Sequence, residues 1–179
     1  GSAQAGFTQV VTSPMRAGET VARSKTSSGR FEFLRPNRFR FEYTRPFEQT
    51  IVADGQTLWL YDVDLNQVTQ RSQSQALGST PAALLASAPD LSALKAEFTL
   101  EAAPEQDGLQ WVLASPKTKD GQLKSVRVGF AGEQLAALDI LDSFGQRSLI
   151  RFNGMQANAA LPASTFQFKP PAGADVVKQ

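Results

Sequence analysis

The sequence contains neither cysteine nor histidine among its 179 residues. The chain therefore lacks the Ser-His and Cys-His pairs of nucleophilic catalysis, an imidazole acid or base, and the usual nitrogen and sulfur ligands of zinc. No glycine-rich phosphate-binding loop occurs either. Aspartates remain, but they flank predicted turns, where Asp is favoured for local hydrogen bonding: Asp62, Asp64, Asp139 and Asp142. The sequence predicts a protein that is not an enzyme and that uses no metal or cofactor.

Charge imbalance and long apolar runs are also missing. The 18 Lys and Arg residues nearly balance the 17 Asp and Glu residues, and a net charge of +1 provides no general attraction to nucleic acid. No apolar run approaches the ~18 residues of a membrane-spanning helix. Gly1-Ser2 is typical of a cloning remnant, so we expect that any signal peptide has been removed. The length predicts a single domain, residues 1–179.

An aromatic pair of segments is the most informative feature that is present. Side chains alternate between the two faces of a strand, so every second residue shares a face. The turn 35–37 separates two such segments, because Pro fixes φ and Asn tolerates the left-handed conformation. One face is predicted to be aromatic and the other charged. The aromatic residues are Phe31, Phe33, Phe39, Phe41 and Tyr43. If the element that covers this face can move, the face becomes a binding site for an apolar ligand.

Strand patterns recur through the rest of the chain and are separated by turn signals such as Asp54-Gly55. Trp59 lies in a strand with bulky residues on both faces, and we expect it to line the same apolar cavity. Regular spacing of short strands predicts a barrel or a strongly curved antiparallel sheet. The predicted strands are 7–11, 19–26, 30–34, 38–43, 47–53, 57–61, 67–71, 97–101, 109–113, 123–130, 135–141, 147–155 and 165–169.

One helical stretch, about 79–95, interrupts the strands. Ser79 or Thr80 can cap a helix, Pro81 suits its first turn, and the following Ala and Leu residues, including Leu84 and Leu85, favour helix. The stretch is too short to be stable alone, so it must lie against the sheet. We expect a lid over the aromatic face. A permanent helical plug without a ligand is the alternative.

Several motifs in consistent order resemble the periplasmic outer-membrane lipoprotein carrier of the Lol pathway. They are Phe7-Thr8-Gln9, the 35–39 turn with its Arg-Pro-Asn, the 54–61 stretch from Asp-Gly to Tyr, the 78–81 helix start, and 166–176 at the C-terminus. Singly these motifs are weak, but their shared order is fairly specific. The resemblance covers the chain from about Phe7 to its end.

The resemblance implies an incomplete, strongly curved antiparallel half-barrel with a helical lid over an apolar cavity. It implies a soluble periplasmic carrier of a Gram-negative bacterium. Its cargo would be triacylated lipoproteins, received from an inner-membrane ABC-type transporter and passed to an outer-membrane receptor. A domain of the same fold that senses lipid or envelope stress is the alternative function. A lipid-modifying enzyme in a closed barrel is a third.

The resemblance also implies roles for residues. Arg35 matches an arginine that holds the lid closed through backbone carbonyls, although an ordinary turn arginine is the alternative. Phe39 matches a residue at the cavity mouth that engages the transporter. The acyl-chain cavity would be lined by Phe31, Phe33, Phe41, Tyr43 and Trp59. The lid would include Pro81, Leu84 and Leu85.

The resemblance implies an amphipathic N-terminal helix, but only six residues precede Phe7 in this sequence, so this helix is either deleted or lies before Gly1. We therefore expect part of the aromatic lining and a strand edge near Phe7 to be uncovered. Exposed apolar surface tends to become buried by another molecule. If the helix is deleted, this predicts self-association of the chain as a dimer; if the helix belongs to the protein, we expect a monomer.

Overall fold

Twelve strands form one sheet in the computed structural model, which describes residues 1–35, 37–73, 95, 98–117 and 123–179. The order across the sheet is β12-β6-β5-β4-β3-β2-β1-β11-β10-β9-β8-β7. The strands are β1 (Ser2–Thr12), β2 (Ser24–Leu34), β3 (Arg38–Arg45), β4 (Gln49–Ala53), β5 (Thr57–Asp62), β6 (Gln67–Ser72), β7 (Phe98–Gln106), β8 (Leu109–Pro116), β9 (Leu123–Ala131), β10 (Gln134–Asp142), β11 (Arg147–Ala157) and β12 (Asp175–Lys178).

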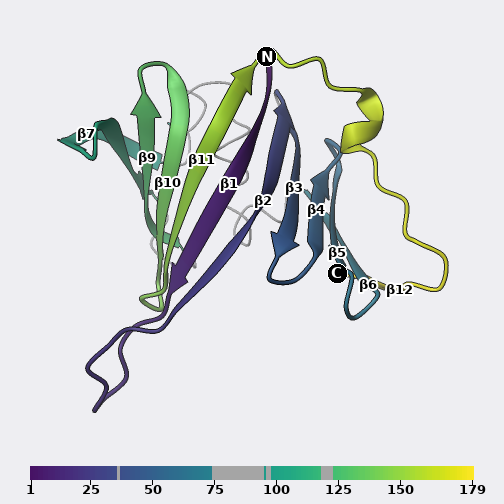
Figure 1. Ribbon diagram of the computed structural model, residues 1–179, viewed down its shortest axis with the longest axis horizontal. Coiled ribbons are helices and arrows are strands. Elements are labelled where there is room, and N and C mark those ends of the chain that lie inside the picture. Colours follow the sequence, from purple (N-terminus) through teal and green to yellow (C-terminus); the bar gives the residue numbers. More distant parts are fainter. Residues whose placement is uncertain (36, 74–94, 96–97, 118–122) are drawn as a thin grey trace.

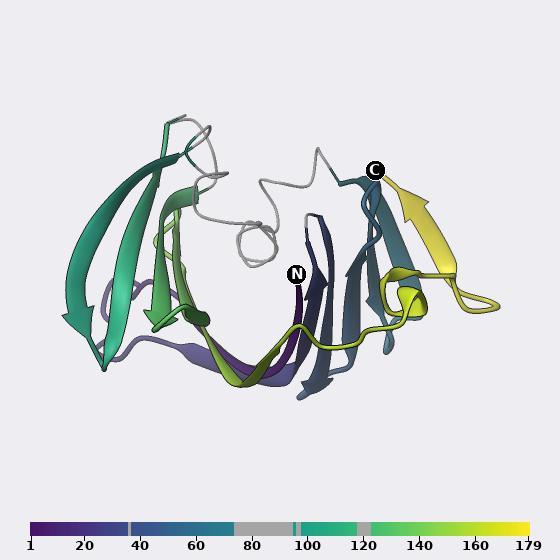
Figure 2. The same ribbon diagram turned by 90° about the horizontal axis from the view of Figure 1, so that it is seen from above.

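The sheet curves into an open trough (Figures 1 and 2). Neighbouring strands are antiparallel, except that β12 runs parallel to β6. Strands β7 and β12 form the two edges, and they are not paired with each other. The prediction of a mainly β, incomplete and curved barrel is confirmed in this open form. Apart from Lys95, the predicted lid helix at 79–95 lies outside the described residues. No helix among the described residues has the length and apolar character needed to span a membrane.

The two N-terminal strands lie at the centre of the sheet. Strand β1 begins at Ser2 and pairs with β2 on one side and β11 on the other. The predicted uncovered edge near Phe7 is therefore wrong, and the expected dimer loses that argument. Strand β2 is continuous over Ser24–Leu34, whereas the sequence predicted two segments. Residues 27–29 lay outside both predicted segments, but the ladder passes through them and joins Gly29 to Phe7.

The hydrophobic core lies on the inner, concave face of the sheet. Strand registers align apolar residues across it, since Phe31 pairs with Phe41, and Phe41 pairs with Ile51. Burying such side chains stabilises the fold by about 1.5–3 kcal/mol for each large residue. The core cluster is Ala3, Phe7, Phe31, Phe33, Phe39, Phe41, Ile51, Ala53, Leu58, Ala114, Val126, Val128, Leu138, Ile140 and Ile150.

The C-terminal segment crosses the outer face of β3–β6 before β12 joins the sheet (Figure 2). The predicted strand 165–169 is wrong: residues Ala163–Phe166 form a 3-10 helix, and the final strand is Asp175–Lys178. Phe166 is buried, and Phe168 contacts Trp59. Phe166 and Phe168 alternate with polar residues as in a strand. They pack against the sheet, but their segment does not pair with it.

Candidate functional site: the inner face of the curved sheet

Four phenylalanines from β2 and β3 form a continuous aromatic surface on the inner face. Phe31, Phe33, Phe39 and Phe41 are each at most 5% exposed. The ring centroids of Phe31 and Phe41 lie 4.4 Å apart, and those of Phe31 and Phe33 lie 5.6 Å apart. Phe33 pairs with Phe39 across the two strands. The face assignment made from the alternation is therefore correct for these residues.

Two further phenylalanines extend this surface across the centre of the sheet. Phe7 on β1 meets Phe41 and Tyr43 edge to face, with centroid distances of 5.3 and 5.1 Å. Phe152 on β11 lies 5.3 Å from Phe31. Neither residue was singled out from the sequence as part of the site. The signal was present for Phe7, which shares a face with Ala3 and Ala5 at the alternating positions of β1.

The other wall of the trough is aliphatic. Strands β8–β11 contribute buried residues whose side chains are smaller than those of the aromatic wall: Ala114, Val126, Val128, Leu138, Ile140 and Ile150. Half-buried apolar residues pack around the core cluster: Leu60, Phe98, Leu100, Leu123, Phe130, Leu135, Phe152 and Met155. The inner face is thus apolar from β5 to β7, and it is suited to hydrocarbon chains.

Tyr43 belongs to this face but brings a hydroxyl group to it. Its ring lies beside Phe41, and its hydroxyl group donates a hydrogen bond to Gln9 Oε1 at 2.5 Å. Burial raises the pKa of Tyr43 to about 12, because the phenolate would lose its hydration. Tyr43 is therefore protonated at any physiological pH.

Trp59 does not line the inner face, and this prediction is corrected. Ile51 pairs with Leu60, which places Leu58 and Leu60 inside and the intervening Trp59 outside. Its ring centroid lies 5.4 Å from that of Phe168, and its indole N–H donates to Asp54 Oδ2 at 3.3 Å. The C-terminal segment covers the outer face of β5, so this strand carries bulky residues on both faces. The alternation in the sequence therefore did not indicate which face lies inside.

Arg35 lies at the turn between β2 and β3, at one end of the inner face. Its backbone N–H donates to the Gly1 carbonyl at 2.9 Å. Its guanidinium carbon lies 5.2 Å from the centroid of the Phe33 ring, which places the charge over the end of the aromatic surface. Pro81, Leu84 and Leu85, the predicted lid residues that it would hold, lie outside the described residues.

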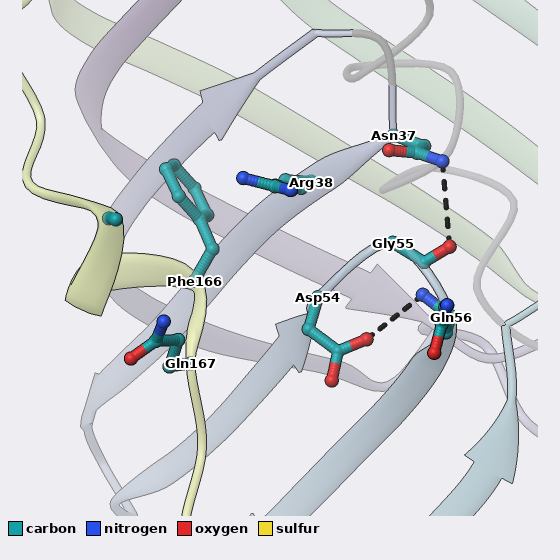
Figure 3. Close-up of a pocket in the computed structure, with 8 residues that line it drawn as sticks. Asn37, Arg38, Asp54, Gly55, Gln56, Phe166 and Gln167 are labelled. Carbon is teal, nitrogen blue, oxygen red and sulfur yellow. Dashed lines mark hydrogen bonds between the residues drawn. The ribbon is translucent and has the colours of Figure 1, made fainter.

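A second hollow, of about 460 Å³, lies between the β2–β3 and β4–β5 turns and the C-terminal segment (Figure 3). Its lining is Asn37, Arg38, Asp54, Gly55, Gln56, Ala163, Phe166 and Gln167. Gln73 ties the two turns together, since its amide donates to the Asn37 carbonyl at 2.6 Å and accepts from the Gly55 N–H at 3.0 Å. Sequence reasoning missed this hollow because it forms between segments far apart in the chain.

Asp54 is held in place as the anchor of the β4–β5 turn. Burial alone would raise the pKa of its carboxyl group. Hydrogen bonds from the backbone N–H groups of Thr57 and Gln56, the Trp59 indole and the nearby Arg38 charge together outweigh burial and lower that pKa. The ionised carboxylate is a structural acceptor at the β4–β5 turn.

The outer face carries charges, in contrast to the inner one. Asp139, which the sequence placed beside a turn, lies instead within β10, between Arg127 and Arg147, with nitrogen–oxygen distances of 3.6 and 3.5 Å. Arg127 also covers the ring of Trp111, its guanidinium carbon 4.6 Å from the ring centroid. This segregation of charge and hydrocarbon between the two faces leaves the apolar inner face as the candidate binding site.

The comparisons with known proteins agree with this geometry. The family described as "Outer membrane lipoprotein carrier protein LolA" matches residues 1–169. The outer-membrane lipoprotein carrier protein of Albidiferax ferrireducens is 70% identical over 98% of this chain and 84% of its own. That of Leptothrix cholodnii is 58% identical over 99% of this chain and 80% of its own. A crystal structure of a LolA superfamily protein from Nitrosomonas europaea, 12% identical, covers 93% of this chain and 90% of that one with a TM-score of 0.51, which shows a shared fold.

Proposed function

The chain belongs to the family of outer-membrane lipoprotein carrier proteins, and we propose that it binds the acyl chains of lipoproteins on the inner face of its curved sheet. It is a carrier and not an enzyme. The observation that supports acyl binding is the apolar surface that continues from the phenylalanines of β2 and β3 to the aliphatic residues of β9–β11. Lipoproteins bound for the outer membrane must cross the periplasm, so we propose that the chain carries its cargo through that compartment.

Acyl binding must be weak enough to be reversed. Each methylene removed from water contributes ~0.8 kcal/mol, so three long chains would amount to tens of kcal/mol if water were the competing state. The competing state is a membrane, which makes the net affinity much smaller. The proposed lid would lower it further, because the acyl chains would then take the place of Leu84 and Leu85, which lie outside the described residues.

Arg35 is proposed as the polar latch of that lid, which would begin near Pro81. Its position over Phe33 supports this role, because a donor at the end of the aromatic surface can reach backbone carbonyls of a covering segment. The hydrogen bonds from Arg35 to the lid would be present in a closed, empty state and absent from an open, cargo-bound state.

The proposed partners are an inner-membrane ABC-type transporter that delivers the cargo and an outer-membrane receptor that accepts it. Phe39 is the proposed contact at the mouth of the site. It is the first inward-facing residue after the β2–β3 turn, but only 1% of it is exposed. A partner can therefore touch Phe39 only after the inner face has opened, which would couple docking to cargo transfer.

Release of a lipoprotein from spheroplasts tests the carrier function. Spheroplasts with a radiolabelled lipoprotein in the inner membrane are incubated with the purified chain, and the supernatant is analysed for a soluble complex. We expect labelled lipoprotein to appear in complex with the chain. Cargo that stays in the membrane, while the chain binds lipid or a regulatory protein, would instead favour a sensor of the same fold.

A further inference from the structure

A row of three polar side chains crosses the otherwise apolar inner face, and we call it the polar row: Tyr43, Gln9 and Ser148. The three residues come from β3, β1 and β11. The Tyr43 hydroxyl group donates to Gln9 Oε1 at 2.5 Å, and Gln9 Nε2 donates to Ser148 Oγ at 2.7 Å. Each is two positions from an inward-facing core residue, namely Phe41, Phe7 and Ile150. The row therefore lies on the same face as the proposed acyl site.

The row lies at the end of the aromatic surface farthest from Arg35. Along β3, Tyr43 is four residues beyond Phe39, a distance of about 13 Å in an extended strand. Phe41 lies between them on the same face. All three residues of the row are half-buried. A ligand on the inner face would thus meet hydrocarbon along the phenylalanines and polar groups at this end.

The row can donate further hydrogen bonds. A primary amide has two N–H donors and a hydroxyl group has one. Gln9 uses one N–H on Ser148, and the Ser148 hydroxyl oxygen accepts that bond. Among the described residues, neither the second Gln9 N–H nor the Ser148 hydroxyl proton has a hydrogen-bond acceptor. Tyr43 stays protonated because burial raises its pKa, so Gln9 Oε1 remains occupied and the Gln9 amide keeps its orientation.

Ester and amide carbonyls are the ligand groups that match these donors. Such groups accept hydrogen bonds but have no strong O–H donor, and they stand at the head of every ester- or amide-linked acyl chain. A carbonyl transferred from water to a wholly apolar surface loses its hydrogen bonds without replacement, which disfavours binding. A donor row at one end of a hydrocarbon surface removes that penalty and aligns the chain along the surface.

We propose that the polar row binds the ester or amide carbonyls at the head of the cargo's acyl chains, so that the chains extend from Gln9 toward Phe33 and Phe39. This inference rests on the proposed acyl-binding function. It assigns a direction to the bound lipid and identifies Gln9 and Ser148 as residues that distinguish an acyl ester from a plain hydrocarbon.

The test compares two ligands that differ in the carbonyl group. Methyl palmitate and hexadecane each displace a fluorescent naphthylamine probe from the full chain, and apparent affinities are measured for the wild type and for Gln9→Leu and Ser148→Ala. We expect the ester to bind about fivefold more weakly to each variant, the effect of one lost hydrogen bond, while hexadecane changes by less than about twofold. Ser148→Ala keeps the test informative if Gln9→Leu fails to fold.

Gln4→Leu is the matched control, because Gln4 is on the outward-facing side of the same strand and forms its own bond to Gln156 at 2.6 Å. It should leave both affinities unchanged. Equal weakening of ester and hexadecane would mean that the row only supports the sheet, and unchanged ester affinity would mean that it does not touch the ligand. Either result overturns the inference. Failure of wild-type chain to bind either ligand would instead contradict acyl binding itself.

Discussion

Phe7 and Tyr43 meet edge to face, 5.1 Å between ring centroids, although the intervening strand β2 separates the strands that carry them. The contact is formed across Gly29, which pairs with Phe7 on one side and with Tyr43 on the other. Gly29 has no side chain, and a Cβ at this position would meet the backbone of Glu42 and Tyr43. The same contact brings the Tyr43 hydroxyl group to Gln9 on β1.

Gly29→Ala should destabilise the protein. A Cβ at this position would meet the Glu42 carbonyl oxygen at only 1.8 Å, so strands β2 and β3 would have to move apart. We expect a loss of about 1–3 kcal/mol in the free energy of unfolding, measured by urea denaturation. Ser27→Ala, two residues earlier in the strand, should have little effect. Equal stability of the two variants would show that β2 can shift without cost.

The burial of Tyr43 predicts a loss of stability at alkaline pH. The folded-state pKa of about 12 exceeds the unfolded value of about 10, so between these values the folded state retains a proton that the unfolded state releases. The contribution of Tyr43 to the free energy of unfolding is therefore fully present below pH ~10. It is lost as the pH rises to ~12, which lowers the free energy of unfolding by roughly 2–3 kcal/mol. Urea denaturation at several pH values should show this slope in the wild type and a smaller one in Tyr43→Phe. Identical slopes would contradict it.

A charge on the inner face should prevent acyl binding, whereas a charge on the outer face should not. Phe41→Asp should weaken the binding of an acyl probe by more than about tenfold, because an ionised group at a 3% exposed site is poorly hydrated. Arg40→Asp changes the adjacent, outward-facing residue and should alter binding by less than about twofold, since exposed ion pairs contribute little. Phe152→Asp, at a half-buried site, is the second variant should Phe41→Asp unfold. If the inner and outer variants weaken binding equally, the acyl probe does not bind on the inner face.

Arg35→Leu should impair cargo transfer without unfolding the chain. The residue is in an exposed turn, so we expect the free energy of unfolding to change by less than ~1 kcal/mol. Loss of the guanidinium donors should leave the site open, so that cargo-bound carrier accumulates and delivery to the outer-membrane receptor falls. Transfer of radiolabelled lipoprotein measures this, with Arg30→Leu on the outer face as the control. Normal transfer by the variant would remove Arg35 from the mechanism.

The C-terminal segment should contribute to stability through Phe166. Phe166→Ala removes a side chain that is 1% exposed, and we expect a loss of about 3–5 kcal/mol in the free energy of unfolding. Phe144→Ala removes the same side chain from a site that is 77% exposed, and its effect should stay within about 0.5 kcal/mol. Thermal unfolding of the two variants gives the comparison. A Phe166 variant as stable as the wild type would show that the segment is only loosely held.

The sequence by itself determined the strand pattern, the Asp54-Gly55 turn and the inward face of the β2–β3 pair. These follow from local rules, since alternation assigns faces and turn residues set chain reversals. It also determined the absence of cysteine and histidine, and hence the lack of the common catalytic side chains. The family resemblance came from motif order, and the comparisons confirm it.

Only the tertiary structure decided which side of β5 faces inward, because Trp59 and Leu60 are both bulky and alternation gives no sign when both faces are buried. It also decided that 165–169 packs on the sheet, that Phe7 belongs to a central strand, and that Tyr43, Gln9 and Ser148 meet. The residues concerned are far apart in the sequence, since Ser148 lies 139 positions after Gln9. Long-range strand pairing brings such residues together, and no local pattern encodes which strands will be neighbours.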